Sequence, residues 1–336
     1  MMRAFVVKKY KGPIQEAEVP EPVVGERDVL VEVRAAGLNA LDEKIRAGEF
    51  RQVLRYELPL ILGNDVAGTV IGTGKKVQTF APGDEVYARP GKDRIGTLAE
   101  RIAIAEEDLA LKPASISFEE AASLPLVGLT AWQALVERAD LQPGQRVLIH
   151  AGAGGVGTIA IQLAKHLGAT VATTVGADDV DFVRELGADH TIDYRSQDFE
   201  QLLTGYDVVL DSLGGENLEK SLRVLRPGGK AIGIAGPPDP AFGRELGANP
   251  VLRLAMTALS SSIRRQARRR GVTYEFLFMR ASGDQLRELT KLVDKGAVRP
   301  VVRRVVGFDQ TVEALQSLGK EGKTVITRTT ETGEAA

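Results

Sequence analysis

A glycine-rich segment, HAGAGGVGTIAIQLAKHLGA at residues 150–169, constrains the fold more than any other part of this 336-residue chain. Its glycines have the spacing G-x-G-x-x-G, directly after a predicted buried strand and at the start of a predicted helix. Residues without a Cβ let main-chain N–H groups approach a pyrophosphate, and the helix dipole attracts its negative charge. We therefore expect a dinucleotide-binding loop rather than only a tight turn. The expected contacts are Gly152, Gly154, Gly155, Val156 and Gly157.

The segments around this loop alternate between strand and helix patterns. Buried apolar runs are followed by amphipathic stretches at the spacing that is typical of β/α units. This alternation predicts a parallel, doubly wound sheet, in which ligands bind at the carboxyl ends of the strands. The predicted strands cover residues 146–151, 170–175, 190–193, 206–211 and 229–235, and the predicted helices cover residues 156–167, 178–186 and 216–225.

The residues before this region follow a different pattern. From Met1 to about Phe118, short alternating segments such as VLVEVRA at residues 29–35 are separated by frequent Gly and Pro. This pattern predicts a closed or partly closed β-fold. Because the pattern becomes helical from about Glu119, we expect two domains with different architectures in one α/β protein.

The end of the second predicted strand bears on the choice of cofactor. An acidic residue there would select the ribose hydroxyls of NAD, but this strand ends in Thr174, Val175 and Gly176 without a carboxylate. The sequence therefore favours NADP, with NAD as the alternative. Asp178 and Asp179 follow, either as caps of the next helix or as ribose contacts. The predicted cofactor contacts around the adenosine are Thr174, Gly176, Tyr194 by stacking and Arg195 by charge.

Composition excludes several classes of function. The chain has no cysteine, which rules out disulfides, thiolate catalysis and zinc sites with a thiolate ligand. Its net charge of −2 gives no positive field for nucleic acid, and no segment approaches the roughly 20 apolar residues that span a bilayer. The apolar run at residues 4–7 is too short for a secretory signal, so we expect a cytoplasmic protein.

A cluster of arginines stands outside this repeating pattern. It lies at the end of a predicted helix, and we interpret it as a solvated helical face rather than as a lid that binds an anionic group. The cluster consists of Arg264, Arg265, Arg268, Arg269 and Arg270.

Several motifs in one order resemble the zinc-lacking quinone oxidoreductase branch of the medium-chain dehydrogenase/reductase superfamily. They are GLNALDEKIRAG at residues 37–48, PLILGNDVAGTVIGTGKKVQTFAPGDEVYA at 59–88, GTLAERIAIAEEDLALKP at 96–113, AASLPLVGLTAWQAL at 121–135 and GKTVI at 322–326. The resemblance covers residues 2 to 326. It implies a GroES-like domain at residues 1–120 and 281–336, a Rossmann domain at 121–280, an active site in the cleft between them, and a homodimer.

The resemblance also implies chemistry without a metal. Zinc-dependent relatives hold the metal with a cysteine near the first motif and a histidine in a G-H-E element, and this sequence has GLNALD and Gly63-Asn64-Asp65 at those positions. We therefore expect no zinc. Because no Lewis acid would activate an alcohol, the expected reaction is hydride transfer from NADPH or NADH to a quinone or an α,β-unsaturated carbonyl. The alternatives are an enoyl-thioester reductase and a non-enzymatic nucleotide-binding redox sensor or scaffold.

The resemblance assigns roles to a few further residues. Asn39 would face the nicotinamide and the substrate, or only cap a turn, and Asp42 would hold the hydrogen-bond network of the site, or only pair with Arg46. Lys44, Tyr56 or solvent would supply the proton. The remaining predicted cofactor contacts are Thr130, Ser212 and Gly236, the last two being otherwise ordinary turn positions.

Overall fold

The computed structural model describes residues 1–51, 53–318 and 323–328 and divides the chain into two compact units. Unit 1 is Met1–Leu129 with Arg280–Ala336, and unit 2 is Thr130–Met279. The first division falls later than the expected boundary at residue 121. Helix α2 (Phe118–Ala122) packs on strands β3 (Asp28–Gly37) and β5 (Asp65–Thr73), which keeps it in unit 1.

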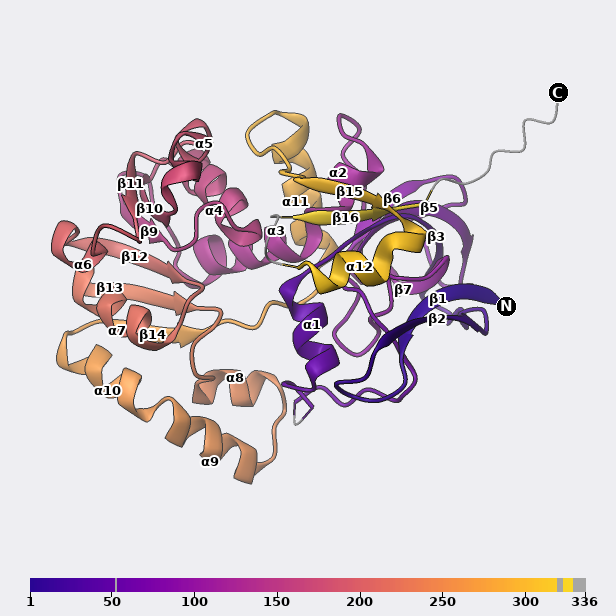
Figure 1. Cartoon of the computed structure of the whole chain (residues 1–336), viewed down its shortest axis with the longest axis horizontal. Coiled ribbons are helices and arrows are strands. Elements are labelled where there is room, and N and C mark those ends of the chain that lie inside the picture. Colours follow the sequence, from indigo (N-terminus) through magenta and orange to yellow (C-terminus); the bar gives the residue numbers. More distant parts are fainter. Residues whose placement is uncertain (52, 319–322, 329–336) are drawn as a thin grey trace. The chain divides into compact units, whose positions relative to one another are not determined.

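Unit 2 is built on one parallel six-stranded sheet, with the strand order β11-β10-β9-β12-β13-β14 (Figure 1). This is the order 3-2-1-4-5-6 of a Rossmann sheet, in which the strand order reverses between the first and fourth strands. The dinucleotide-binding edge therefore lies at the carboxyl ends of β9 and β12. The strands are β9 (Arg146–Ile149), β10 (Thr170–Val175), β11 (His190–Asp193), β12 (Tyr206–Asp211), β13 (Leu225–Gly233) and β14 (Thr273–Phe276).

The helices of unit 2 cover this sheet through apolar side chains. Helix α4 (Gly155–His166) packs on β9 and β10, and α7 (Gly215–Val224) packs on β12 and β13. The buried core includes Leu148, Val209 and Leu222. The connections also contain a 3₁₀ turn at Ala177–Asp179, α5 (Val180–Glu185) and α6 (Phe199–Leu202).

One predicted strand begins earlier than its pattern indicated. The expectation was a strand at residues 229–235 after a turn at Pro227-Gly228-Gly229, but β13 starts at Leu225. Leu225 pairs with Tyr206 before a register shift, and the ladder resumes at Lys230. The glycines therefore form an irregularity inside the strand rather than a turn before it.

Three helices lead into the last strand of unit 2: α8 (Pro240–Glu245), α9 (Pro250–Leu259) and α10 (Ser261–Arg269). Figure 1 shows α9 and α10 following one another along one side of the unit. Helix α10 buries Ile263 and Ala267 and exposes most of the arginine cluster, namely Arg265, Arg268, Arg269 and Arg270, while Arg264 is half-buried. This agrees with the interpretation of a solvated helical face.

Unit 1 is β-rich, as its Gly and Pro punctuation indicated. One sheet has the order β2-β1-β4, and the other has the order β15-β16-β3-β5-β6-β8, with β7 also paired to β3. Their apolar faces enclose a core that includes Phe5, Val31 and Leu38. The strands not yet given are β1 (Met2–Val7), β2 (Ile14–Val19), β4 (Leu60–Ile61), β6 (Glu85–Ala88), β7 (Arg101–Ala105), β8 (Leu109–Leu111), β15 (Arg304–Gly307) and β16 (Thr324–Thr327).

The helices of unit 1 are short. They are α1 (Ala40–Ala47), α2, the first part of α3 (Pro125–Trp132), α11 (Gly283–Asp294) and α12 (Thr311–Gln316), with 3₁₀ turns at Glu106–Asp108 and Phe308–Gln310. A π-helical segment, Gln133–Arg138, continues α3 into unit 2. Across the described residues, none of the helices has the length and apolar character needed to cross a membrane.

Candidate active site

The glycine loop of unit 2 follows β9 and ends where α4 begins. Gly154 is the N-cap of α4, so the amides of the first helical turn, from Gly155 to Gly157, have no carbonyl acceptor within the helix. Ala151 has a φ of 54°, which turns the chain away from the strand. These free amides at a helix N-terminus form the anion-binding arrangement that the sequence predicted.

A hydrogen-bond network beneath the loop holds it in place. The Thr174 hydroxyl accepts from the Ala151 amide at 3.2 Å, and lies 3.0 Å from Nδ1 of His150. Nε2 of His150 lies 2.9 Å from the hydroxyl of Ser221. Burial lowers the pKa of His150, which keeps the ring neutral. Thr174, predicted to touch the cofactor, therefore uses its hydroxyl to support the loop.

Three loop glycines differ in how much space surrounds them. A Cβ on Gly152 would lie 2.2 Å from the Thr173 hydroxyl oxygen, and one on Gly157 would lie 2.3 Å from the Ala151 carbonyl oxygen. The protein itself thus excludes side chains at these two positions. A Cβ on Gly154 would meet nothing closer than 3.1 Å. This cradle fits a dinucleotide, because the glycines allow a tight turn from strand to helix that leaves the first amides of α4 available to a pyrophosphate.

The tip of β10 brings together the residues expected around an adenosine. A Cβ on Gly176 would lie 3.6 Å from the guanidinium carbon of Arg195, which in turn lies 5.6 Å from the centre of the Tyr194 ring. Arg195 also lies 3.7 Å from the Asp178 carboxylate, and both side chains are exposed. An arginine therefore does reach the end of this strand, although it comes from the segment after β11.

Of the other predicted cofactor contacts of unit 2, two follow the ends of different strands and one lies on a helix. The Ser212 hydroxyl, after β12, donates to the His150 carbonyl oxygen at 3.3 Å. Gly236, after β13, is close to Tyr274, since a Cβ there would lie 2.4 Å from the phenol oxygen. Thr130 is buried on α3. Ser212 and Gly236 thus lie on the carboxyl side of the sheet, as expected.

In unit 1, the strand registers bring charged residues from four segments to one sheet edge. Asp65 pairs with Gly37, and Val66 pairs with Ala88, so Arg89 follows β6 next to Asp65. Val325 also pairs with Gly37, which places Lys323 beside the residues that follow β3. Residues that are far apart in the sequence thereby reach one edge of the sheet.

A buried cluster of polar side chains occupies this edge. Lys323 donates to Oδ1 of Asn39 at 2.8 Å and to Oδ2 of Asp65 at 2.9 Å. Asn39 Nδ2 also donates to Asp65 Oδ2 at 2.9 Å, while Asp65 Oδ1 accepts from the Leu126 amide at the start of α3. Asn39 is only 6% exposed, and both carboxamide ends are held within the cluster. Asn39 is also the N-cap of α1 and donates to the Gly37 carbonyl oxygen, so it combines the role of a local cap with a place in this cluster.

Asp42 extends the cluster and does not pair with Arg46. Its carboxylate accepts from the Asn39 amide and from Nδ2 of Asn64, at 2.8 and 2.7 Å, whereas Arg46 pairs with Glu43. Asp42 therefore belongs to a buried hydrogen-bond network, and the alternative ion pair with Arg46 is wrong. Complete burial raises the pKa of Asp42 to about 6, although the hydrogen bonds from Asn64 and Asn39 oppose this shift.

The two predicted proton donors differ in their surroundings. The phenol of Tyr56 donates to the Lys92 carbonyl oxygen at 2.7 Å, and burial raises its pKa. Its proton is therefore committed to the protein backbone. Lys44 is half-buried on α1, and its side chain has neither a hydrogen bond nor an ion pair with another described residue.

Sequence reasoning missed Lys323 and Arg89. Lys323 belongs to the GKTVI motif, whose order in the chain was recognised but whose lysine received no role; Gly322 lies outside the described residues. No local signal joins Lys323 to Asn39, because 284 positions separate them. Arg89 directly follows the strand DEVYA, where a basic residue in an otherwise buried run was the available signal.

Asn64 and Asp65, from the Gly63-Asn64-Asp65 segment that stands where the resemblance expects a G-H-E element, lie within this cluster. Among residues 1–51, 53–318 and 323–328, no three His, Asp or Glu side chains are grouped so that they could hold a metal ion. The buried cation beside Asp65 is instead the Lys323 ammonium.

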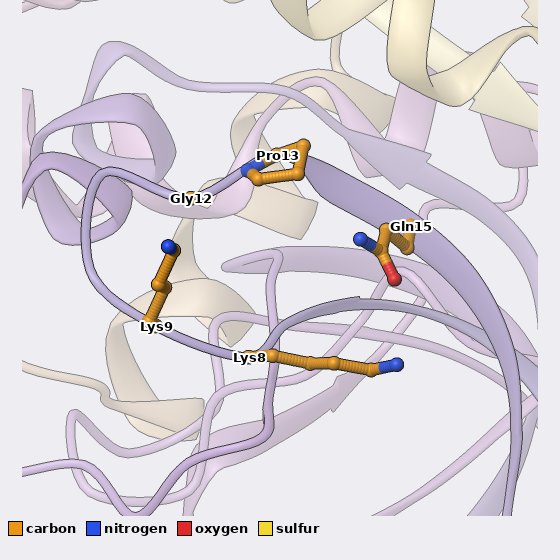
Figure 2. Close-up of a pocket in the computed structure, with 5 residues that line it drawn as sticks. All are labelled: Lys8, Lys9, Gly12, Pro13 and Gln15. Atoms are coloured by element: carbon orange, nitrogen blue, oxygen red, sulfur yellow. The ribbon is translucent and has the colours of Figure 1, made fainter.

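A shallow hollow of about 320 Å³ lies elsewhere on unit 1 (Figure 2). It is formed at the turn between β1 and β2 and shares no residue with the cluster or the glycine loop. Its lining side chains include two exposed lysines but no carboxylate or aromatic ring, so it does not resemble a substrate site. The lining residues are Lys8, Lys9, Gly12, Pro13 and Gln15.

Comparison with known families agrees with both units. Residues 25–114 match the model of the alcohol dehydrogenase GroES-like domain, and residues 186–326 match the model of a zinc-binding dehydrogenase domain. A zebrafish (Danio rerio) protein, the mitochondrial NAD(P)H oxidoreductase RTN4IP1, is 37% identical over 97% of this chain and 91% of its own length. The chain belongs to the medium-chain dehydrogenase/reductase superfamily.

Other members of this superfamily indicate the relevant branch. The chloroplastic NADPH-dependent alkenal/one oxidoreductase of Arabidopsis thaliana is 37% identical over 90% of this chain and 72% of its own length. The quinone oxidoreductase from Coxiella burnetii has a similar structure, with a TM-score of 0.83 and 31% identity over 98% of this chain and 99% of that one. The CurK enoyl reductase has a TM-score of 0.80 and 27% identity over 97% and 99% of the two chains.

Proposed function

We propose that this protein transfers hydride from NADPH to an α,β-unsaturated carbonyl or a quinone, without a metal. The observation that carries the proposal is the main-chain cradle at residues 152–157, in which Gly152 and Gly157 have no room for a side chain. The names of the alkenal/one oxidoreductase and the quinone oxidoreductase support the class of acceptor. Bound nicotinamide would supply the hydride.

Unit 2 has the task of binding and orienting the dinucleotide. The amides at the start of α4 would bind the pyrophosphate, and the His150–Thr174 and Ala151–Thr174 contacts hold the loop in its conformation. Ser212 and Gly236 are proposed to border the nicotinamide, and Thr130 to contact the cofactor. Preorganisation of this kind reduces the ordering that binding would otherwise require.

Unit 1 has the task of stabilising charge on the acceptor. When hydride adds to the β-carbon of an enone, the π electrons move to the carbonyl oxygen, and an enolate forms. The buried cluster of Asn39, Asp42 and Lys323 gives this unit a fixed electrostatic environment that needs no reorganisation during the reaction. The enolate then takes a proton at the α-carbon, which completes the reduction.

We assign the proton to solvent. Tyr56 already donates to a backbone carbonyl, and its raised pKa makes proton release unfavourable. Lys44 has no partner that fixes its ammonium among the described residues, so nothing orients it as a donor. Reduction rates should therefore respond to solvent deuterium without depending on either side chain.

We further propose a preference for NADPH over NADH. The tip of β10 has no carboxylate, and Arg195 extends its guanidinium to Gly176, where a 2′-phosphate would lie. Arginine suits this role because its planar fork can donate two parallel hydrogen bonds to a phosphate. Asp178 would contact Arg195 or water rather than the ribose.

A two-stage experiment tests the proposed function. Purified protein is dialysed against a chelator and titrated with NADPH and NADH by calorimetry, and the tighter cofactor is then mixed with enones, enals and quinones. We expect NADPH absorbance to fall with at least one acceptor in metal-free protein. Failure to bind either dinucleotide at millimolar concentration, or turnover that needs stoichiometric zinc, would contradict the proposal.

An enoyl-thioester reductase is the second candidate, favoured by the exposed arginines of α10 and by the similarity to an enoyl reductase. The arginines would bind the phosphate of a carrier. Including acyl thioesters in the acceptor panel separates the candidates, because this one predicts higher kcat/KM for a carrier-bound enoyl group than for the free enone. If instead the protein binds nucleotide, reduces no acceptor and stably co-purifies with another protein, the redox-sensor or scaffold alternative would be supported.

The proposed assembly is a homodimer, and the proposed location is the cytoplasm. Both come from the family resemblance and the chain's composition. Light scattering coupled to size-exclusion chromatography should return about twice the chain mass of 36.1 kDa, and a value near one chain mass would contradict the dimer. Because the zebrafish relative is named as mitochondrial, fractionation of the native cell is the test of location.

A further inference from the structure

Arg89 is a buried cation without a counterion. Its side chain is 1% exposed, and no carboxylate among the described residues forms an ion pair with it. Nη1 donates to the Pro90 carbonyl oxygen at 2.7 Å, and Nε has no hydrogen-bond partner in the part of the chain that the structure describes. By contrast Arg94, five residues later, forms two hydrogen bonds with Asp28 and is 44% exposed.

Burial of an unpaired guanidinium opposes folding, because the protein removes its hydration without replacing the hydrogen bonds. This cost is also visible in the pKa of Arg89, which burial lowers although Tyr56, Asp65, Asp108 and Asp42 oppose the shift through space. Buried polar groups in proteins nearly always have a partner. A free donor at this position therefore indicates that Arg89 interacts with a molecule other than the protein.

Two other unpartnered atoms belong to the same sheet edge. Oδ1 of Asn64 and the hydroxyl of Thr97 are buried, and neither has a hydrogen-bond partner within residues 1–51, 53–318 and 323–328. Thr97 lies against Gly63, where a Cβ would be 2.3 Å from its hydroxyl oxygen. Asn64 follows Gly63 in the chain, and Arg89 follows β6 next to Asp65. Arg89 Nε, Asn64 Oδ1 and the Thr97 hydroxyl, which lack partners among the described residues, therefore lie beside the Asn39–Asp42–Lys323 cluster.

The charges around Arg89 indicate which kind of ligand fits. Lys323 and Arg89 provide two positive charges, and Asp65 and ionised Asp42 provide two negative charges. Asp108 adds a further negative influence. The region therefore has no excess of positive charge for a multiply charged anion such as a phosphate, although Arg89 can pair with a single oxyanion. A neutral molecule with an acceptor oxygen would satisfy the free N–H groups and leave the charges balanced.

We propose that Arg89 binds the acceptor oxygen of the substrate, the carbonyl oxygen of an enone or one oxygen of a quinone. This inference rests on the proposed function and adds a substrate-binding residue to it. Hydride bonds to the acceptor carbon, the π pair moves to the oxygen, and the Arg89 N–H groups stabilise the resulting oxyanion while Arg89 stays protonated. The oxidised nicotinamide and a reduced substrate, protonated by solvent, complete the balance.

Single-turnover kinetics of Arg89→Met test this role, since methionine fills similar space but cannot donate. We expect the rate constant of hydride transfer from bound NADPH to an enone to fall about 100-fold, as when a single oxyanion donor is removed from other enzymes. The affinity for NADPH should change less than about twofold, because the glycine cradle, and not Arg89, is proposed to bind the dinucleotide. Arg94→Gln is the matched control, and we expect the wild-type rate from it.

A second measurement keeps the inference testable if Arg89→Met does not fold. Substituted phenols resemble a hydroquinone anion, and their binding to wild-type protein and to Arg89→Lys can be followed by calorimetry without any hydride transfer. We expect phenols of lower pKa to bind wild type more tightly, because the phenolate pairs with the guanidinium. The lysine variant should show a weaker dependence on phenol pKa, because it lacks the planar fork of donors.

The outcomes separate this inference from the proposed function. If wild-type protein reduces enones and Arg89→Met matches it within about threefold per folded molecule, Arg89 is structural and the inference is wrong. The same conclusion follows if phenol affinity is independent of phenol pKa in wild type, which would leave ordered water as the partner of Arg89. If wild type binds phenolates through Arg89 but reduces no acceptor, the proposed function fails and the assignment of Arg89 as an oxygen-binding residue stands.

Discussion

The two candidate sites of this protein differ in what builds them. In unit 2, the proposed cofactor cradle is made of main chain within a few consecutive residues, and Gly152 and Gly157 have no room for a side chain. In unit 1, the cluster is made of side chains from three separate segments, and its members are buried polar or charged groups. The first site requires positions without side chains, whereas the second requires charged side chains that pair with one another.

This difference determines how each site should respond to mutation. A side chain added to the cradle acts locally, through steric overlap with neighbouring main chain. A side chain removed from the cluster leaves other buried charges without partners, so its effect spreads to every member. Stability should therefore depend more on single residues of the cluster, and cofactor affinity more on single residues of the loop.

The largest expected effect is that of Lys323→Met. It leaves Asp65 buried with Asn39 and the Leu126 amide but without its cation, and breaking a buried pair in this way costs about 3–5 kcal/mol. Urea unfolding followed by circular dichroism should show this loss of stability. Lys76→Met, which removes an exposed ion pair with Glu26, is the control and should change the stability by less than about 1 kcal/mol. Equal effects of the two substitutions would contradict the account of the cluster.

The second effect concerns the pH dependence of Asp42. Its pKa of about 6 lies above the unfolded value of 3.8, so between these values the native state binds more protons than the unfolded state. This group therefore stabilises the fold at low pH and loses that contribution as pH rises through 6. Two pKa units correspond to about 3 kcal/mol as an upper estimate.

Comparison with Asp42→Asn isolates this contribution. The variant can still accept from the Asn39 amide, and its own amide can donate to Oδ1 of Asn64 once the Asn64 carboxamide flips to exchange its oxygen and nitrogen. The stability of wild type relative to this variant should fall between about pH 4 and pH 7, as measured by unfolding at each pH. A difference that stays constant or rises over this range would show that Asp42 is already ionised at low pH.

The third effect contrasts two glycines of the loop. Gly157→Ala forces a Cβ against the Ala151 carbonyl, and we expect a loss of about 1–3 kcal/mol in stability together with weaker NADPH binding. Gly154→Ala meets no atom closer than 3.1 Å, so we expect it to retain the wild-type thermal midpoint and to weaken only cofactor binding. Thermal melts with and without NADPH distinguish the two. A stable Gly157→Ala variant with normal affinity would show that the cradle does not work as described.

The smallest effect is expected from Arg195→Gln. The side chain is exposed, and its ion pair with Asp178 contributes little to stability. We expect the dissociation constant for NADPH to rise about tenfold, as for the loss of one charge-assisted contact, while that for NADH stays unchanged. Parallel calorimetric titrations measure this ratio. An equal loss of affinity for NADPH and NADH would show that Arg195 contacts a part of the cofactor that both share, and not the 2′-phosphate.

The comparison also explains what the sequence could predict. Strands β10 and β12 were predicted with the bounds that the structure has, because each is a short buried run between clear turn signals. The glycine cradle was also predictable from local sequence, because the amides that would bind an anion belong to consecutive residues. The start of β13 was not, since a register shift beside Pro227 carries the strand through glycines that otherwise indicate a turn.

The cluster of unit 1 was predicted only in part. Asn39 and Asp42 stand in a recognisable motif, but their partners depend on strand registers that bring β16 and β6 to the same edge. The choice between Arg46 and the buried network as the partner of Asp42 depended on tertiary packing, since Glu43 offers Arg46 an equally local partner. The roles of Lys323 and Arg89 depend on burial, which no single stretch of sequence encodes.

Isotope transfer provides the decisive experiment. Metal-free protein is incubated with NADPH carrying deuterium at C4 of the nicotinamide, one stereoisomer at a time, and with an enone, and the product is examined by mass spectrometry and NMR. Direct hydride transfer predicts that one isomer delivers its deuterium to the β-carbon of the enone, while the α-hydrogen comes from solvent. A reduced product without deuterium at the β-carbon from either isomer would contradict the mechanism.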